Sequence, residues 1–491
     1  MIHASVRMEG PMTERPPGLL IDGEWRRSLS SDTGSVEDPS TAQAVGVFDI
    51  GHKEDAEAAI AAARRAFDSG PWPQMSPRDR RSRLLELAGL IDDSSEEIAD
   101  ICVREVGAPR KSVLEWQVNS AMTQFRQAIE CGSQDLEIVL PSEKGDSVQE
   151  FVVREPRGVV SAIASWNSPH VLQLHQLGPA LITGNAMVLK PALNTPTCAL
   201  HLGLLAQEAG IPPGVVNIVP GDIDVGVTMV NDPRVDMVSF IGSTSVGIEI
   251  AQRAATSLKR VLLELGGKSA LIAMSDAKLD DVVALATGIT WLTGQGCGLI
   301  TRLVLASSIH DEVVDRVVDA LSGIKTGSAH DPETDMGPLS SAAQLERVET
   351  YIQLGLDEGA SLAIGGERPD VRESGYYIEP TLFTDVDRKM RIAQEEIFGP
   401  VLSVIRFDGS PETAVDIAND SQYGLTAGVF TSDRALGLQM ARAIKSGRVN
   451  VNNWVFSPKG PFGGYKRSGI GRMWGRFGVE EYTEVKNICW S

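Results

Sequence analysis

The sequence predicts an α/β protein built from a doubly wound parallel sheet, a second α/β unit and a small β element. Short apolar runs alternate with helical windows from residue 158 onward, and a second alternation of the same kind follows Gly266. The chain has 491 residues, which is too long for one hydrophobic core, so two or three domains are expected. Its 42% hydrophobic and 22% charged residues are typical of a globular protein.

Helical patterns dominate the N-terminal region. Residues 54–67 are rich in Ala and stop before Gly70-Pro71, as expected of a helix. Ser76 is a good N-cap and is followed by Pro77 in the first turn, and the helical pattern then continues to Gly107. We interpret this region as helical packing that carries no chemistry.

An extended hairpin precedes the strands of the predicted parallel sheet. Residues 137–155 alternate in polarity and contain polar breaks, which predicts the hairpin. The strand-like runs that follow are residues 158–164, 186–189, 215–219, 237–241 and 260–263, with a helical window at 195–209. The second alternation has helical windows at 279–291 and 310–324 and strand-like runs at 303–305, 401–407 and 427–430.

Charge and cysteine content exclude several classes of protein. The formal net charge of −20 disfavours nucleic acid and anionic membranes as partners. The five cysteines are scattered and form no C-x-x-C pair, so no metal site is indicated and a reducing compartment is favoured. Residues 1–17 contain no apolar stretch, and no run approaches the roughly 18 to 20 apolar residues that span a bilayer. We therefore expect a soluble, cytoplasmic protein.

Two glycine motifs look like nucleotide-binding signatures but lack the required context. Segment 469–471 follows no predicted strand and lies close to the C-terminus. Segment 266–269 ends like a P-loop, but the position of the required first glycine is occupied by Leu262. Neither motif is retained.

A more informative glycine turn contains Gly242 and Ser243. It follows the predicted strand 237–241 and opens a helix, so free N–H groups and the positive end of the helix dipole favour a pyrophosphate there. A plain glycine turn capped by Ser243 is the alternative.

Three further residues have side chains suited to catalysis. Glu264 ends a predicted strand beside two glycines, which let the backbone approach a ligand closely and suit a general base. Cys297 lies between Gly296 and Gly298, which favours an accessible thiol. Asn167 follows the first strand of the parallel sheet, where its amide can donate to an oxyanion. Taken singly, a surface-facing glutamate, a buried inert cysteine and a turn asparagine are the more common interpretations.

Together these segments resemble the aldehyde dehydrogenase superfamily over about residues 20–486. Seven segments follow in the family's order: Trp166-Asn167, 184–191, 240–247, 264–268, 294–297, 395–400 and 461–469. One such motif is modest evidence, so the resemblance rests on all seven in that order.

The resemblance implies the oxidation of a small-molecule aldehyde to a carboxylic acid with NAD or NADP. Cys297 would attack the carbonyl, and the Asn167 side chain with the Cys297 N–H would hold the oxyanion. Hydride transfer to the nicotinamide would leave a thioester, and Glu264 would activate the water that hydrolyses it.

The resemblance also implies the cofactor site. Lys190 would contact the adenosine ribose, Gly242 and Ser243 the pyrophosphate, Glu396 the nicotinamide ribose, and Phe398 would pack near the ring. The full expected set is Trp166, Lys190, Gly221, Gly242, Ser243, Val246, Leu265, Glu396 and Phe398.

The same resemblance divides the chain. Residues 19–137 and 156–264 would form a dinucleotide-binding domain and residues 265–466 a catalytic domain. Residues 138–155 and 467–491 would form the oligomerisation element of a homodimer or homotetramer, and residues 1–18 a flexible leader.

Departures from the family pattern concern specificity. Leu193 stands where the family often has a glutamate that binds both ribose hydroxyls, so we favour NAD modestly and leave NADP open. Ser168 replaces an aromatic residue of the aldehyde channel, which together with Gly296 and Gly298 predicts a wider channel for bulky or branched aldehydes. Met473 replaces a glutamate, which removes a possible salt bridge near the C-terminus.

Other functions stay open on the sequence alone. An acylating dehydrogenase would pass the thioester to coenzyme A or phosphate, but such relatives usually lack the glutamate that Glu264 matches. A catalytically silent binding protein on the same fold is the second alternative, against which Cys297, Glu264 and Asn167 all argue. An esterase side activity needs only the thiol and the oxyanion site.

Overall fold

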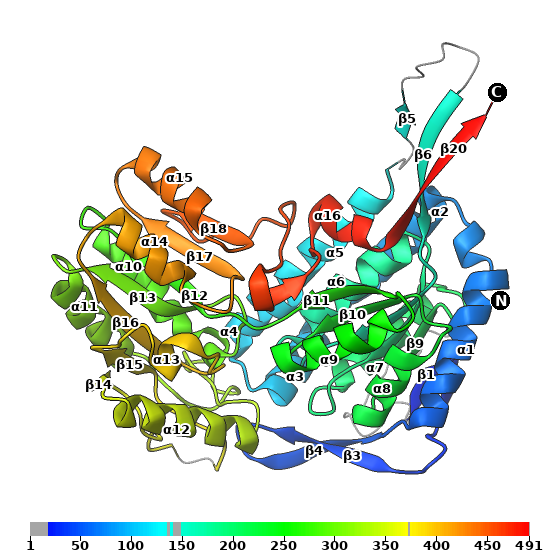
Figure 1. The fold of residues 1–491 in the computed structure, drawn as a ribbon. Coiled ribbons are helices and arrows are strands. Elements are labelled where there is room, and N and C mark those ends of the chain that lie inside the picture. The colour runs from blue at the N-terminus through cyan, green and yellow to red at the C-terminus, as the bar shows by residue number, and fades with distance from the viewer. Residues whose placement is uncertain (1–17, 135–137, 141–148, 372–373, 491) are drawn as a thin grey trace.

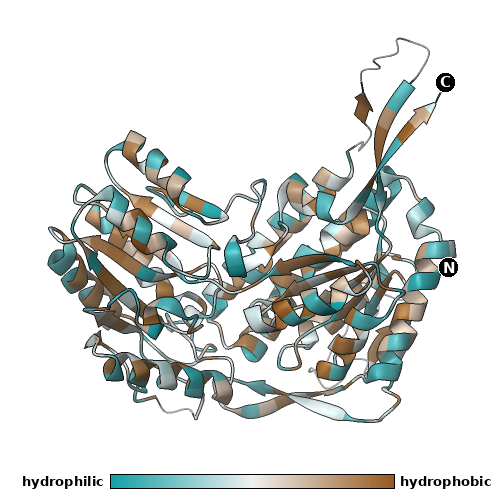
Figure 2. Ribbon diagram, in the orientation of Figure 1, coloured by the Kyte–Doolittle hydropathy of each residue, from teal (hydrophilic) through white to brown (hydrophobic). Residues whose placement is uncertain are grey.

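The computed structural model of the protein describes residues 18–134, 138–140, 149–371 and 374–490. Two lobes, each built around one β-sheet, lie side by side, and an arm of three strands projects from one of them (Figure 1). Apolar residues are concentrated in the strands of both sheets (Figure 2). The expected leader lies outside the described residues except for Gly18.

The first sheet contains the strands of the predicted doubly wound unit. Its strands are β1 (Leu19–Ile21), β2 (Glu24–Arg26), β7 (Val159–Ile163), β8 (Ala186–Lys190), β9 (Val216–Ile218), β10 (Met237–Ile241), β11 (Arg260–Glu264) and β19 (Gly469–Ile470). The spatial order is β19-β11-β10-β7-β8-β9-β1-β2. The central strands from β11 to β9 are parallel, whereas β1, β2 and β19 pair antiparallel at the edges.

The chain reverses its lateral direction between β7 and β10. From β7 it proceeds through β8 to β9 on one side, and then returns to β10 and β11 on the other side. Such a switch point leaves a crevice outside the carboxyl ends of the strands. The loops after β7 and β10 carry Asn167 and Gly242, so the topology brings these two residues to the same edge.

Helices cover the first sheet in two packed groups. One group contains α1 (Lys53–Ser69), α8 (Ile223–Asn231) and α9 (Thr244–Ala255). The other contains α2 (Pro77–Asp93), α3 (Ser95–Val106), α4 (Arg110–Val113), η3 (Leu114–Ser120), α5 (Ala121–Gly132), α6 (Pro169–Ile182), α7 (Thr197–Glu208) and α16 (Gly475–Glu481). The short η2 (Trp72–Gln74) links α1 to α2.

Sequence signals located several helix ends but missed the first strands. Ser76 Oγ accepts the N–H of Asp79 as the N-cap of α2, and α3 ends at Gly107 with a left-handed φ of 77°. The helical interpretation of residues 54–107 is confirmed by α1, α2 and α3. No element was expected for residues 19–49, which contain β1, β2, β3 (Thr33–Asp38) and β4 (Gln43–Asp49). β1 and β2 have three residues each, which is too short for a periodic pattern, so only their tertiary partners reveal them.

The second sheet forms the other lobe. It contains β12 (Ser269–Ala273), β13 (Ile300–Ala306), β14 (Ser361–Ile364), β15 (Thr381–Thr384), β16 (Val401–Phe407), β17 (Thr426–Phe430) and β18 (Arg448–Val451), in the order β14-β15-β16-β13-β12-β17-β18. The helical elements of this part of the chain are α10 (Leu279–Thr287), η5 (Gly288–Gly294), α11 (His310–Ser322), α12 (Ala342–Asp357), α13 (Arg391–Gln394), α14 (Pro411–Asn419), α15 (Arg434–Ala443) and η6 (Lys466–Ser468).

The helix predicted over 279–291 ends earlier, at Thr287. The chain leaves helical geometry at Trp291, and Leu292 and Thr293 have φ values of 49° and 54°. The apolar pattern continues beyond the helix because Ile289 and Leu292 are buried in the following loop. Helical periodicity therefore overestimated the length of this helix.

The projecting arm contains the predicted hairpin. β5 (Ile138–Leu140) and β6 (Gln149–Pro156) pair antiparallel, and β20 (Thr483–Trp490) pairs antiparallel with β6. The turn of the hairpin, residues 141–148, lies outside the described residues. Segment 467–491 does not lie in the arm as a whole. β19 joins the first sheet and α16 packs on α5, so β20 is the part of this segment that belongs to the arm. A role of the arm in oligomerisation stays a prediction. In the described part of the chain, no helix is long and apolar enough to cross a membrane.

Candidate active site

Two cavities meet at Cys297. The first, which we call the polar cleft, has a volume of about 600 Å³ and lies at the carboxyl ends of β7, β10 and β11. The second, which we call the aromatic chamber, has a volume of about 580 Å³ and is defined by the rings of Trp116, Trp291, Trp454, Phe456, Phe462 and Trp474. Both cavities are lined by Asn167, Leu172, Ile241, Glu264 and Cys297. The fold thus brings the three predicted catalytic residues to one place.

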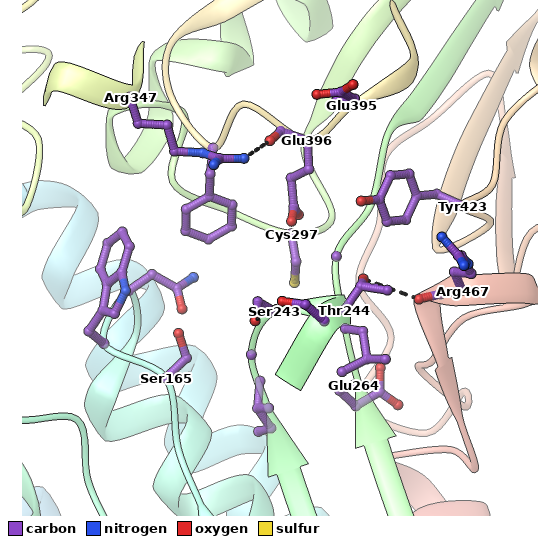
Figure 3. A pocket seen from close by; sticks show the side chains of 18 of the residues that line it. Ser165, Ser243, Thr244, Glu264, Cys297, Arg347, Glu395, Glu396, Tyr423 and Arg467 are labelled. Carbon is purple, nitrogen blue, oxygen red and sulfur yellow. Dashed lines mark hydrogen bonds between the residues drawn. The ribbon is translucent and has the colours of Figure 1, made fainter. Parts of the chain in front are cut away.

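The loop that carries Cys297 is shaped by a close backbone contact. Gly294 has a φ of 72°, and a Cβ there would lie 2.1 Å from the carbonyl carbon of Gly399. Only glycine tolerates both conditions, so this residue lets the loop pack against the segment before β16. The Cys297 side chain is half-buried and lies between Glu396 and Glu264 (Figure 3).

The surroundings of Cys297 favour the protonated thiol. Burial raises the pKa of Cys297 to about 12, with a smaller contribution from the nearby carboxyl groups of Glu396 and Glu264. Loss of water around a thiolate and repulsion by like charges both disfavour the anion. In this state of the protein, a base is therefore needed to generate the nucleophile.

Glu264 is a buried carboxyl group at the end of β11. Its side chain is 4% exposed, and neither carboxyl oxygen has a hydrogen-bond partner among the described residues. Burial raises the pKa of Glu264 well above its ordinary value, and the charge of Arg472 opposes this shift only in part. The alternative of a surface-facing glutamate is wrong. A buried carboxyl group with a raised pKa is a suitable proton acceptor near neutral pH.

Asn167 is oriented by a hydrogen bond across the junction of the cavities. Its Nδ2 donates to the carbonyl oxygen of Gln295 at 2.9 Å. The side chain of Gln295 is fixed in turn, because its Oε1 accepts the N–H of Ser340 at 3.0 Å and its Nε2 donates to Leu292 O at 3.1 Å. An amide nitrogen carries two hydrogens, so Asn167 retains one for a second acceptor.

The turn with Gly242 and Ser243 leads directly into α9. Ser243 is the N-cap residue by position, but its side chain makes no capping hydrogen bond. The alternative of a turn capped by Ser243 is therefore wrong. Gly242, Ser243, Thr244 and Ser245 all line the polar cleft, so the first turn of α9 presents its N–H groups and the positive end of its dipole there.

Glu396 faces this turn from the other lobe. Its Oε1 accepts the N–H of Gly267 at 2.9 Å, and a Cβ on Gly266 would lie 2.3 Å from its Oε2. Arg347 fixes the backbone of this segment, because its guanidinium donates hydrogen bonds to the carbonyl oxygens of Glu396 and Ile397 at 2.5 and 3.1 Å (Figure 3). The glycine at 266 is thus required by the close approach of this carboxyl group.

An aromatic pair forms another part of the wall of the polar cleft. The rings of Phe398 and Trp166 meet edge to face with centroids 5.4 Å apart. Phe398 has a φ of 65°, a region that costs energy for a side chain of this size. Both rings line the cleft, where they were expected from the sequence.

The remaining residues expected at the cofactor site are distributed differently. Leu265 lines the polar cleft, whereas Lys190, Gly221 and Val246 are not among its lining residues in the described chain. Lys190 ends β8, and burial lowers its pKa to about 8. Cofactor contacts at Lys190, Gly221 and Val246 stay predictions.

Sequence reasoning missed much of the lining. In the polar cleft these residues are Gln344, Arg347, Tyr351, Gln422 and Tyr423, and in the aromatic chamber they are Trp116, Trp291, Trp454, Phe456, Trp474 and His175. They come from places far apart in the chain and lie outside the seven segments of the resemblance. Only their tertiary positions identify them.

Two departures from the family pattern lie in the wall of the aromatic chamber. Ser168 Oγ accepts a hydrogen bond from Trp116 Nε1 at 3.0 Å. Met473 is 3% exposed and pairs with Phe462 through two backbone hydrogen bonds. The loss of a possible salt bridge at Met473 stays a prediction, and its side chain also lines this chamber.

A cleft at the switch point of a parallel sheet, with a thiol where it meets an apolar chamber, is typical of a dinucleotide-dependent enzyme. The chain belongs to the aldehyde dehydrogenase family, whose sequence model matches residues 25–488. The resemblance inferred from the seven segments is thereby confirmed.

Individual relatives match over nearly the whole chain. The geranial dehydrogenase of Castellaniella defragrans is 38% identical over 472 residues, which are 96% of this chain and 98% of that protein. Retinaldehyde dehydrogenase 3 of Homo sapiens is 37% identical over 475 residues, 96% of this chain and 92% of that protein. The structure of an aldehyde dehydrogenase from Bacillus cereus in complex with NAD+ has a TM-score of 0.94 and 38% identity, and the match covers 98% of this chain and 97% of that one. The predicted α/β fold class is confirmed.

Proposed function

We propose that this protein oxidises an aldehyde to a carboxylic acid with NAD+, through a thioester on Cys297 that water hydrolyses. One observation carries the proposal. Cys297, Asn167 and Glu264 line both cavities, between a cleft suited to a dinucleotide and a chamber suited to an organic substrate.

The lining of the polar cleft fits NAD+. The uncapped first turn of α9 offers N–H groups and a positive dipole end to the pyrophosphate. Glu396 presents a carboxylate that can accept ribose hydroxyls, and the missing side chain of Gly266 gives this carboxylate the room that it occupies. Complexes of similar proteins with NAD+, such as those from Bacillus cereus and Mycobacterium tuberculosis, support the assignment. When bound, NAD+ supplies the acceptor for the hydride that leaves the carbonyl carbon.

Cys297 and Asn167 would carry the first half of the reaction. The thiol loses its proton to solvent water, and the sulfur forms a bond to the carbonyl carbon while the π bond of the carbonyl breaks and its electrons move to oxygen. The free amide hydrogen of Asn167 and the N–H of Cys297 then donate to the oxygen as it becomes negative. One such donor typically lowers the barrier by about 2.7 to 4 kcal/mol.

Glu264 would carry the second half. Once the carbon is oxidised, it is bound to Cys297 as a thioester. Glu264 accepts a proton from water, the oxygen of that water attacks the thioester carbon, and the C–S bond breaks. The acid leaves and the thiol is regenerated. An acylating route to coenzyme A would not need a buried base at this position.

Substrate choice does not follow from sequence identity. Relatives named for geranial and for betaine aldehyde are 38% and 36% identical to this chain, although those two compounds differ in charge. The walls of the aromatic chamber must therefore decide which aldehyde is bound. The cytoplasmic location and the homo-oligomeric state expected from the sequence stay predictions.

The test is a panel of aldehydes assayed with NAD+ and NADP+ in parallel, with and without coenzyme A. We expect NADH and free acid to form in equal amounts, and coenzyme A to leave the product unchanged. Cys297→Ala should abolish turnover and keep NAD+ binding in a thermal-shift assay. Turnover that survives Cys297→Ala would show the mechanism to be wrong, and formation of an acyl-coenzyme A would establish the acylating route.

A further inference from the structure

The aromatic chamber has walls of aromatic rings that pack against one another. Phe462 stacks on Trp474 with centroids 4.6 Å apart, and Phe456 contacts Trp116, Trp454 and Trp474 edge to face at 6.0 to 6.1 Å. Such packing between rings adds to the energy of burial and fixes their orientation. The shape of the chamber is therefore set before a substrate enters.

The rest of the wall is mainly aliphatic and leaves room beside the thiol. Leu285, Leu299 and Met473 line the chamber, and Gly296 and Gly298 flank Cys297 without side chains. A Cβ on Gly298 would have its nearest neighbour at 3.5 Å, which is an ordinary van der Waals contact, so the wall at this position has room for a methyl group. A volume of about 580 Å³ lies in the range of roughly 300 to 1,000 Å³ that is typical of pockets for drug-sized ligands, and far exceeds the need of a two-carbon aldehyde.

The charges around the chamber disfavour a substrate that carries a carboxylate. Among its described lining residues the acidic side chains are Glu115 and Glu264, there is no Lys or Arg, and burial lowers the pKa of His175 to about 3, so the imidazole stays neutral. A substrate carboxylate would find no cation to pair with. The guanidinium of Arg448 lies 4.4 Å from the ring centroid of Phe456, so it occupies one face of that ring and would repel a second cation.

From this wall we propose that the substrate class is a neutral, bulky aldehyde with an apolar ring or branched body, held by the rings of the aromatic chamber. This inference rests on the proposed function and extends it to the organic half of the reaction. The polar end of the molecule is the aldehyde itself, directed toward Cys297 and Asn167. The apolar body lies against Trp116, Trp291 and Trp474, where each additional buried methylene should raise kcat/KM about fourfold until the chamber is filled.

The first test compares neutral aldehydes of increasing size with two charged aldehydes. Acetaldehyde, hexanal, cyclohexanecarboxaldehyde and cinnamaldehyde form the neutral series, and betaine aldehyde and succinate semialdehyde are the charged probes. We expect kcat/KM to rise from acetaldehyde to the ring-containing aldehydes by at least about a hundredfold, mainly through KM. A preference for acetaldehyde or for either charged probe would overturn the proposal.

The second test uses a matched pair of variants at one ring. Trp116→Ala removes the ring, whereas Trp116→Phe keeps an aromatic wall, and both remove the hydrogen bond to Ser168. Trp116→Ala should raise KM for cyclohexanecarboxaldehyde by at least about tenfold relative to Trp116→Phe, because only the phenylalanine keeps an aromatic face against the ring of the substrate. Equal behaviour of the two variants toward the ring aldehyde would refute a role of the ring.

Failure of this inference is distinguishable from failure of the proposed function. If the protein oxidises small or charged aldehydes and Cys297→Ala abolishes that activity, the mechanism stands and only the substrate class is wrong. If no aldehyde reduces NAD+, although NAD+ binds to the folded protein, the proposed function is wrong.

Discussion

The side-chain amide of Asn167 donates a hydrogen bond to the carbonyl oxygen of Gln295, 2.9 Å away across 128 residues of sequence. Asn167 follows β7 of the first lobe, whereas Gln295 immediately precedes the Gly296-Cys297 step. The contact therefore ties the proposed oxyanion donor to the loop of the proposed nucleophile. Because the amide is held before substrate binds, little reorganisation is needed when negative charge develops.

Asn167→Ala should lower kcat by about 10² to 10³-fold, since one oxyanion donor is lost. NAD+ affinity should stay within a few fold, which isothermal titration can measure. Asn167→Asp is the matched control of size, and its negative charge at the same place should impair kcat at least as much. A loss confined to KM in Asn167→Ala would show that the residue serves binding only.

Glu264→Gln should separate the two halves of the reaction. The amide cannot accept a proton from water, so the thioester should accumulate and steady turnover should collapse. Stopped-flow measurement should still show a burst of NADH, about one equivalent per active site, because acylation precedes the blocked step. Absence of the burst would assign Glu264 to the first half of the reaction instead.

The pH dependence follows from the raised pKa values of Cys297 and Glu264. Both groups act in their deprotonated forms, so activity should increase with pH wherever the pH lies below these pKa values, by up to about tenfold per unit for one group. Alkylation of Cys297 by iodoacetamide, followed by peptide mass spectrometry, measures the thiol directly in the protein without cofactor. Its rate should still be rising at about pH 9, above the ordinary thiol pKa of about 8.5. A plateau below that value would contradict the assignment.

Leu193→Glu should sharpen the choice between NAD+ and NADP+. The half-buried Leu193 follows Lys190, the residue expected at the adenosine ribose, and it offers neither a hydrogen-bond acceptor nor a negative charge. A carboxylate there should accept the ribose hydroxyls of NAD+ and repel the 2′-phosphate of NADP+. The ratio of the two Kd values should shift toward NAD+ by at least about tenfold, and Leu193→Gln controls for shape without charge. An unchanged ratio would place the ribose elsewhere.

Gly266→Ala should disturb the polar cleft through a single methyl group. The new Cβ would lie 2.3 Å from Glu396 Oε2, so the carboxyl group must move from its hydrogen bond with Gly267. We expect weaker NAD+ binding with little change in stability elsewhere. Gly89→Ala in α2 is the matched control, because a Cβ there meets nothing within 4 Å and alanine favours helices. Equal NAD+ affinity of the two variants would show that the position of Glu396 is unimportant for binding.

The predictions of secondary structure were correct where the local sequence pattern extends over several residues. The five central strands of the first sheet appear as apolar runs bounded by turn residues, and Ser76 caps α2 as expected. Strands β1 and β2 were missed because three residues show no period, and α10 was extended too far because its apolar pattern continues into the loop before Cys297.

The candidate catalytic residues could be found in the sequence because they lie in motifs. Glycines beside Glu264 and Cys297 indicate a backbone that approaches another group closely, and such glycines can be recognised in the local sequence. Three other features could not be predicted from the sequence, because each depends on residues of another segment. They are the burial of Glu264, the absence of a capping hydrogen bond from Ser243 and the orientation of Asn167.

The amino-acid sequence alone determined the α/β class, the family resemblance and the order of the chemical groups along the chain, because turn chemistry and apolar periodicity act over a few residues. Only the tertiary structure decided that the thiol is protonated at rest and that six rings from distant segments enclose the second cavity. A pKa depends on the water and charge that surround a group in three dimensions, and the shape of a cavity depends on which side chains meet, so neither is encoded at any one position.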